Sequence, residues 1–226
     1  MSEAEYFQKL REQMVTWQIQ RRGLTNERLL EAFRRIPRHL FVPGEHQSSA
    51  YEDHPLPIGC GQTISQPYIV ALMTSLLELN GSQRVLEIGS GSGYQAAILA
   101  CLAAEVHSLE LHPDLAERAA RHLAELGLRN AHIHCADGSA GWPEAAPYDG
   151  ILVTAAAPQP PPALLEQLAP GGRLVIPVGG RGEQSLQRWQ RSPSGWKVED
   201  VLPVVFVPLR GAAGWDEEHW PAHPEE

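Results

Sequence analysis

From residue 84 onward, short apolar runs alternate with longer amphipathic runs. The apolar runs predict buried β-strands over 85–89, 106–111, 131–134, 150–153 and 173–178. Helical spacing in three of the intervening stretches predicts helices over 94–104, 113–127 and 161–168. Because strands here alternate with helices, the pattern indicates an α/β domain with a doubly wound, parallel sheet.

Two more strand-like runs, 184–191 and 198–207, end the patterned region. A Ser-Pro-Ser-Gly turn lies between them, which is typical of an antiparallel hairpin at a sheet edge. Pro170, Gly171 and Gly172 predict a separate turn before the 173–178 run. The sum is a mostly parallel sheet of seven strands.

The first 80 residues are predicted to be mainly helical. One apolar stripe is expected to be buried in a first helix that Gly23 stops, and it comprises Tyr6, Leu10, Met14 and Trp17. Thr25 is placed to cap a second helix, which Pro37 ends. The stretch from Arg38 to Gln62 is rich in His, Pro and Gly and predicts a loop.

A third helix is expected to begin near Ser65 to Pro67, since proline is tolerated in a first helical turn. Its buried stripe comprises Ile69, Leu72, Met73, Leu76 and Leu77. Gly81 is expected to close it. At this position Ser65 has two interpretations, a plain N-cap or a residue that contacts a ligand.

Composition narrows the class of function. The chain has 226 residues and a net charge of -9, which disfavours general attraction to nucleic acid. Its three cysteines show no metal-ligand spacing, and the N-terminus shows no apolar signal core. We therefore expect one soluble, cytoplasmic and monomeric domain, without a membrane or nucleic-acid partner. Its expected parts are 1–80, a core over 81–210 and a tail over 211–226.

The strongest chemical signal is the turn Gly89-Ser90-Gly91-Ser92-Gly93 between a strand and a helix. Glycine lets the backbone turn sharply there and lets a ligand approach closely. Glu110 lies at the end of the second strand, where an acidic side chain can bind ribose hydroxyls. Asp137-Gly138 follows the third, where a carboxylate can hold an adenine amino group. Such strand ends converge on one crevice, so these residues predict a nucleoside site.

The glycine spacing is GxGxG rather than the GxGxxG of many dinucleotide sites. A dinucleotide needs its pyrophosphate at a helix N-terminus, whereas S-adenosylmethionine has no phosphate. The acidic Glu87 inside the motif suits a ligand with an ammonium group and a sulfonium, or it anchors the loop. At this point the residues resemble class I S-adenosylmethionine methyltransferases.

The stretch after the fourth strand, Val153 to Pro158, lacks the Asn/Asp-Pro-Pro-aromatic motif of enzymes that methylate base amines. The segment Tyr51 to Tyr68 instead resembles the signature of protein-L-isoaspartate O-methyltransferases. The resemblance extends to 37–43, 146–149, 168–174 and 207–209, and covers roughly residues 10–210. Cys60 departs from the family pattern, in which a polar or aromatic residue is more usual.

The resemblance implies a Rossmann-like methyltransferase fold. In this family the last two strand positions of the sheet are exchanged relative to other class I methyltransferases. The resemblance also implies S-adenosyl-L-methionine as cofactor and isoaspartyl proteins and peptides as substrates, esterified on the free α-carboxylate. With the crevice argument, the expected cofactor residues are Glu87, Gly89, Ser90, Gly91, Gly93, Glu110, Leu111, Asp137 and Gly138. The expected substrate residues are Thr63, Ile64, Ser65 and Val207, with Ser65 catalytic.

No general base is expected, because a carboxylate with a pKa near 4 is already ionised at neutral pH. His132 and His134 share one face of a strand, but no third ligand is evident, so no metal site is expected. The alternatives are a class I methyltransferase acting on a small carboxylic acid or RNA, and a non-catalytic relative that binds the cofactor. The intact Thr63-Ile64-Ser65 segment speaks against a non-catalytic relative.

Overall fold

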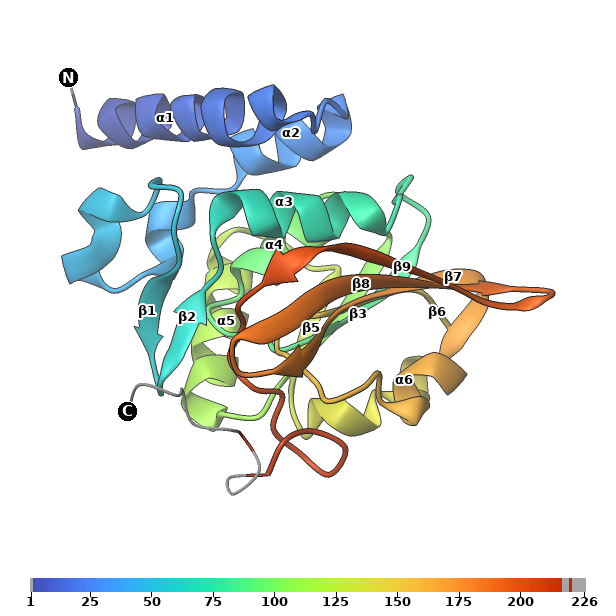
Figure 1. The fold of residues 1–226 in the computed structure, drawn as a ribbon. Coiled ribbons are helices and arrows are strands. Elements are labelled where there is room, and N and C mark those ends of the chain that lie inside the picture. Colours follow the sequence, from blue (N-terminus) through green and yellow to red (C-terminus); the bar gives the residue numbers. More distant parts are fainter. Residues whose placement is uncertain (1, 217–219, 221–226) are drawn as a thin grey trace.

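The computed structural model describes residues 2–216 and 220. Within that part of the chain, seven strands form one sheet in the order β5-β4-β3-β6-β7-β8-β9 (Figure 1). The pairings among β3 to β7 are parallel, and β7-β8 and β8-β9 are antiparallel. The strands are β3 (Arg84–Ile88), β4 (Glu105–Glu110), β5 (Ala131–Cys135), β6 (Tyr148–Val153), β7 (Leu168–Gly180), β8 (Glu183–Ser192) and β9 (Gly195–Val204). The predicted doubly wound, mostly parallel sheet is confirmed, and its last three strands lie in chain order.

Helices cover both faces of this sheet (Figure 1). They are α1 (Glu3–Met14), α2 (Glu27–Arg35), α3 (Pro67–Leu76), α4 (Tyr94–Ala100), α5 (Pro113–Glu125) and α6 (Pro162–Glu166). Alternate residues of β3 serve the two faces, as a strand requires. Val85 packs in one apolar cluster with Leu77 and with Leu99 of α4. Leu86 packs in the opposite cluster with Leu164 of α6.

The N-terminal helices stack on the outer side of α3 (Figure 1). The first continues beyond α1 as a π-helical turn, Val15–Ile19, and ends at the left-handed Gly23. The expected buried stripe is partly wrong, since Tyr6 is 40% exposed and Trp17 53% exposed. The wider π turn rotates the helix face, so Val15 and Ile19 are buried in place of Trp17.

The caps of α2 and α3 also differ from expectation. Asn26, not Thr25, caps α2, and its side chain accepts a hydrogen bond from the Leu29 N–H at 3.2 Å. The N-cap of α3 is Gln66, so Ser65 lies one residue outside the helix and is not its N-cap. Helix α3 ends at Leu76, well before Gly81.

A two-stranded hairpin, β1 (Leu56–Gly59) and β2 (Gln62–Ile64), leads into α3 (Figure 1). The stretch was expected to be a loop. The strands are short, and both Pro57 and the Gly-Cys-Gly turn obscure the period-2 pattern. All three turn residues have positive φ, including Cys60 at 54°.

Two boundaries in the last part of the sheet were also wrong. Pro170, Gly171 and Gly172 belong to β7, where a register shift against β6 absorbs the expected turn. Strand β9 ends at Val204, so Val207 lies beyond it. Among the described residues, no helix is both long and apolar enough to cross a membrane. The expected tail over 211–226 is described only through Asp216 and at Trp220; its other residues lie outside the described part.

Candidate active site

The glycine-rich turn connects β3 to α4 at the centre of the sheet. Gly89, Gly91 and Gly93 all have positive φ, which only glycine adopts at little cost. At Gly89, an added Cβ would lie 2.3 Å from the Thr154 Oγ1. At Gly93 it would lie 3.1 Å from the Ala119 Cα. The turn therefore passes so close to Thr154 and Ala119 that glycine is required at both positions.

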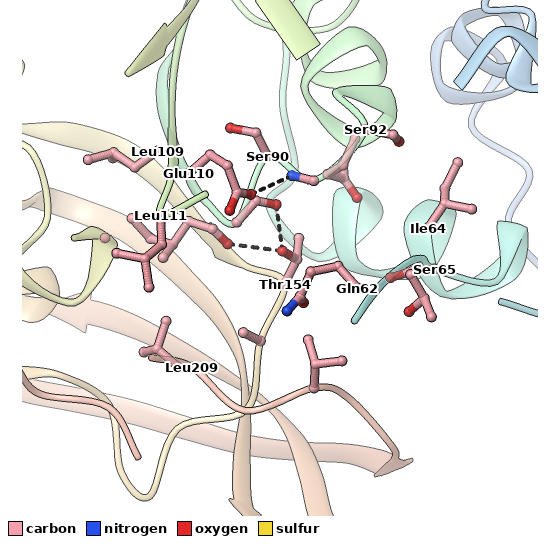
Figure 2. A pocket seen from close by; sticks show the side chains of 18 of the residues that line it. Gln62, Ile64, Ser65, Ser90, Ser92, Leu109, Glu110, Leu111, Thr154 and Leu209 are labelled. Carbon is pink, nitrogen blue, oxygen red and sulfur yellow. Dashed lines mark hydrogen bonds between the residues drawn. The ribbon is translucent and has the colours of Figure 1, made fainter. Parts of the chain in front are cut away.

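A pocket lies beside this turn, at the carboxyl ends of β3, β4 and β6 (Figure 2). This is where a doubly wound sheet places its ligands. Figure 2 shows Glu110 and Leu111 on one side and Ile64 and Ser65 on the other. The expected residues that line it are Thr63, Ile64, Ser65, Gly89, Ser90, Gly91, Glu110, Leu111, Gly138 and Val207.

Glu110 is buried and links two segments that line the pocket. Its two carboxylate oxygens accept hydrogen bonds from the backbone N–H of Gly91 at 2.8 Å and of His112 at 3.0 Å. The first bond holds the glycine turn against β4. The carboxylate also lines the pocket, so it is available to the ribose hydroxyls for which it was predicted.

Glu87 lies on β3 but does not line the pocket. Its side chain is completely buried, and Oε2 accepts a hydrogen bond from the Ser108 hydroxyl at 2.5 Å. Ser108 is in turn 2.5 Å from the hydroxyl of Ser90, which does line the pocket. The second oxygen of Glu87 has no partner, and burial raises the pKa of this carboxyl to about 8. Glu87 is thus connected to the pocket only indirectly, through the hydroxyls of two serines.

Asp137 does not line the pocket, whereas its neighbour Gly138 does. A Cβ on Gly138 would lie 2.4 Å from Ile88 Cγ2, so glycine is needed for close packing against β3. The Asp137 carboxylate accepts hydrogen bonds from Ser139 and from the backbone N–H of Ala212. Burial acts to raise the pKa of Asp137, but these hydrogen bonds outweigh it and leave the pKa below its ordinary value.

The pocket opens into a wider groove between the β1-β2 hairpin region and the end of β9. The residues that line both spaces are Thr63, Ser65, Thr154, Val207, Pro208 and Arg210. Three of the four expected substrate residues thus line both spaces, whereas Ile64 lines only the pocket. Such an arrangement lets a chain in the groove present one group to a small molecule in the pocket.

Thr154 was not expected to be a site residue. Its hydroxyl donates to the carbonyl oxygens of Ile88 and Gly89, at 3.0 and 2.7 Å (Figure 2). It follows β6, the neighbour of β3, so the rule that strand ends converge could have found it. Gln62, Leu209 and Arg210 also line the pocket, but they come from the unpredicted hairpin and the C-terminal segment.

The two histidines of β5 lie near a third, His107 of β4, whose Nδ1 is 3.1 Å from His134 Nε2. The rings of His107 and His132 are 5.3 Å apart. Within the described part of the chain, no group of three or more His, Cys, Asp or Glu side chains is arranged to hold a metal ion.

The comparisons with known proteins agree with this geometry. The family model described as protein-L-isoaspartate(D-aspartate) O-methyltransferase matches residues 9–214. The chain belongs to this family. The predicted family and Rossmann-like methyltransferase fold are therefore confirmed.

Relatives in the family match nearly the whole chain. Protein-L-isoaspartate O-methyltransferase 1 of Syntrophobacter fumaroxidans is 54% identical over 93% of this chain and 98% of its own length. The enzyme of Methanospirillum hungatei is also 54% identical, over 92% of this chain and 96% of its own. A solved protein-L-isoaspartate O-methyltransferase superposes with a TM-score of 0.83 at 31% identity, covering 90% of this chain and 67% of that one.

A Plasmodium falciparum structure shares the fold, with a TM-score of 0.76 and 24% identity. It covers 90% of this chain and 98% of that one. That protein is described as a putative protein-L-isoaspartate O-methyltransferase, in complex with S-adenosyl-L-homocysteine. Members of this family use S-adenosyl-L-methionine as the methyl donor, so the predicted cofactor is confirmed.

Proposed function

We propose that the chain transfers a methyl group from S-adenosyl-L-methionine to the free α-carboxylate of L-isoaspartyl residues in damaged proteins and peptides. The observation that carries this proposal is the junction at Ser65, where a groove for a peptide meets the pocket of the family's methyl donor. The resulting ester cyclises to a succinimide, whose hydrolysis returns some normal aspartate.

The fit of the donor rests on the pocket's own residues. Gly89, Ser90 and Gly91 of the glycine turn line the pocket, and Glu110 presents a carboxylate at the pocket wall. When bound, the donor supplies a methyl group on a sulfonium. The O–C bond forms as the S–C bond breaks, the S–C electron pair stays on sulfur, and both charges are neutralised.

The chain's residues have to position the acceptor and exclude water, since the carboxylate needs no general base. We assign Ser65 to hold the acceptor carboxylate, with Thr63 and Ile64 shaping the same wall. Ile64 is 4% exposed and supports a dry surface there. Val207 lies across the junction, and because its carbonyl oxygen accepts a hydrogen bond from the Ala156 N–H at 2.8 Å, we assign its N–H to the backbone of an extended peptide.

The direct test uses two peptides that differ only in the linkage of one residue, isoaspartyl or normal aspartyl. Incubation with labelled S-adenosyl-L-methionine should give a base-labile methyl ester on the isoaspartyl peptide alone. Equal labelling of both peptides, or labelling of neither, would contradict the proposal.

We further propose a cytoplasmic monomer without a nucleic-acid or membrane partner. The three cysteines, Cys60, Cys101 and Cys135, are free, which suits a reducing compartment. The net charge of -9 disfavours broad binding to phosphates. Light scattering on the peak that elutes from a size-exclusion column measures the molar mass of the protein and tests the proposed monomer. The mass of a dimer would contradict the proposal.

A further inference from the structure

Arg38 is a completely buried arginine directly behind Ser65. It begins the 3-10 turn Arg38–Phe41 and is 0% exposed. Its Nε donates a hydrogen bond to the Ala50 carbonyl oxygen at 2.7 Å, and one Nη donates to the Ser65 carbonyl oxygen at 2.8 Å. The other Nη is buried and makes no hydrogen bond of ordinary length and angle; the Tyr94 hydroxyl, which acts on the guanidinium, is likewise buried without one. The guanidinium therefore fixes the backbone of Ser65 and keeps one donor group unused.

The charge of Arg38 is not paired. Within the described residues, none of its three nitrogens meets a carboxylate. The carboxylate of Asp53 acts on it only weakly and forms its own ion pair with Arg22 at 3.0 Å. Burial lowers the pKa of Arg38 to about 10, so the group is still a cation at neutral pH. Buried charges are normally paired, because desolvation is costly.

The other ionisable groups around Arg38 do not neutralise it. The guanidinium carbon is 5.0 Å from the centre of the Tyr94 ring, which gives a cation–π contact. Burial raises the pKa of Tyr94, so this phenol is neutral. Tyr51 is also an uncharged phenol, and His54 belongs to the same segment as Asp53 and is paired with Glu52 at 2.8 Å. A net positive charge is therefore left behind Ser65 and Tyr94, in the part of the protein that we call the wall.

That wall is part of the site. Both Ser65 and Tyr94 line the pocket, and Arg38 contacts each of them from the protein side. We propose that Arg38 is a positioning residue for the acceptor, whose buried charge stabilises the ionised carboxylate at Ser65. The inference rests on the proposed function, because it needs an anionic acceptor at that point.

The charge argument predicts which kinetic constant changes. The bound acceptor carries a full negative charge, and methyl transfer neutralises that charge as it proceeds. A fixed cation therefore stabilises the bound acceptor at least as much as the transition state, and its loss should raise KM more than it lowers kcat. A residue that only held the Ser65 backbone would lower kcat instead.

The test compares Arg38→Gln, which keeps an N–H donor but removes the charge, with Arg38→Lys, which keeps the charge. For Arg38→Gln we expect the KM of an isoaspartyl peptide to rise about tenfold. Its kcat and its affinity for S-adenosylhomocysteine should stay within about threefold of wild type. Arg38→Lys should restore most of the KM. Circular dichroism and thermal melting confirm that each variant folds.

Arg118→Gln is the matched control. Arg118 also donates to a backbone carbonyl of the hairpin, that of Ile58, but it is only partly buried. Its replacement should leave the peptide KM within about threefold of wild type, because solvent screens its charge. An equal rise in KM for both variants would show that the backbone clamp matters and not the charge, and would overturn the inference.

A second measurement does not depend on any variant folding. The wild-type enzyme saturated with S-adenosylhomocysteine should bind an isoaspartyl peptide at least about tenfold more tightly than the matching isoasparaginyl amide. Equal affinities would overturn the role of the charge. If wild type methylates no isoaspartyl peptide at all, the proposed function fails; if it does and Arg38→Gln lowers kcat alone, only the inference about Arg38 fails.

Discussion

The carboxylate of Asp137 accepts a hydrogen bond from the backbone N–H of Ala212, 75 residues further along the chain, at 2.8 Å. The hydroxyl of Ser139 adds a second link, because it donates to Asp137 at 2.8 Å and accepts from the Ala213 N–H at 3.0 Å. These bonds hold the C-terminal segment where Arg210 lines the pocket. Asp137 therefore contributes to the pocket by fixing the segment that closes it.

Replacing Asp137 by alanine should weaken the affinity for S-adenosylhomocysteine by about tenfold. The change leaves the Ala212 N–H without its acceptor, which costs about 1 to 3 kcal/mol for a buried group and less for a partly exposed one. Titration calorimetry measures the effect. Ser139→Ala breaks only the second link and should cost less.

A glycine variant separates closure from direct contact with adenine. A Cβ on Gly211, where φ is +126°, would lie 2.0 Å from the Asp137 carboxylate oxygen. Gly211→Ala should therefore displace the segment and weaken the same affinity. If only Asp137→Ala has an effect, Asp137 contacts the ligand directly; if neither has one, Asp137 has no part in cofactor binding.

Ser65→Ala should lower kcat by about one to two orders of magnitude, because the hydroxyl holds the acceptor oxygen in line with the methyl group and the variant loses that orientation. The affinity for S-adenosylhomocysteine should stay the same, because the hydroxyl serves the acceptor. Ser75→Ala is a suitable control, since that hydroxyl only donates to the Leu72 carbonyl oxygen within α3 at 2.7 Å. Full turnover in Ser65→Ala would remove Ser65 from the mechanism.

The sequence predicted the elements that local chemistry determines. The glycine turn, Glu110 and Gly138 were correctly placed beside one pocket because each lies at or just after the end of a parallel strand, and parallel strands end at one edge of the sheet. The β1-β2 hairpin was missed because its strands are short and contain Pro57. The contact between Asp137 and Ala212 could not be predicted, since nothing local marks two segments that meet only in the folded chain.

Side-chain direction was the other limit. Glu87 was expected near the ligand because it precedes the glycine turn, but the alternation of β3 directs it toward Ser108 instead. The buried Arg38 had no assigned role, since burial of a charge is not visible in a sequence motif. Trp17 was misplaced by a π turn that the sequence pattern does not reveal.

Gly89→Ala should weaken both folding and cofactor binding. The new methyl group lies 2.3 Å from the Thr154 Oγ1, and the φ of +92° is strained for alanine. We expect a loss of about 1 to 3 kcal/mol in the free energy of unfolding, measured by urea titration.

A control and a rescue separate the clash from the strain. Gly171→Ala has a similar φ of +80° but no atom within 4 Å of the added Cβ, so it should lose about 1 kcal/mol from strain alone. Adding Thr154→Ala to Gly89→Ala should recover part of the difference. Equal losses for Gly89→Ala and Gly171→Ala would show that the contact with Thr154 is unimportant.

The buried Glu87 should make the stability of the protein depend on pH. Its carboxyl pKa is raised from 4.5 to about 8 in the folded state, because burial disfavours the charged form. Between those values the folded state holds a proton that the unfolded state has released, so the contribution of Glu87 to stability falls as pH rises from about 4.5 to about 8.

Glu87→Gln cannot ionise and can still accept the hydrogen bond from Ser108. The variant should therefore gain stability relative to wild type as pH rises, measured by urea titration at about pH 5 and about pH 8. If the difference between the two proteins is the same at both pH values, Glu87 is ionised in the folded protein and its hydrogen bonds to the serines stabilise a charged group.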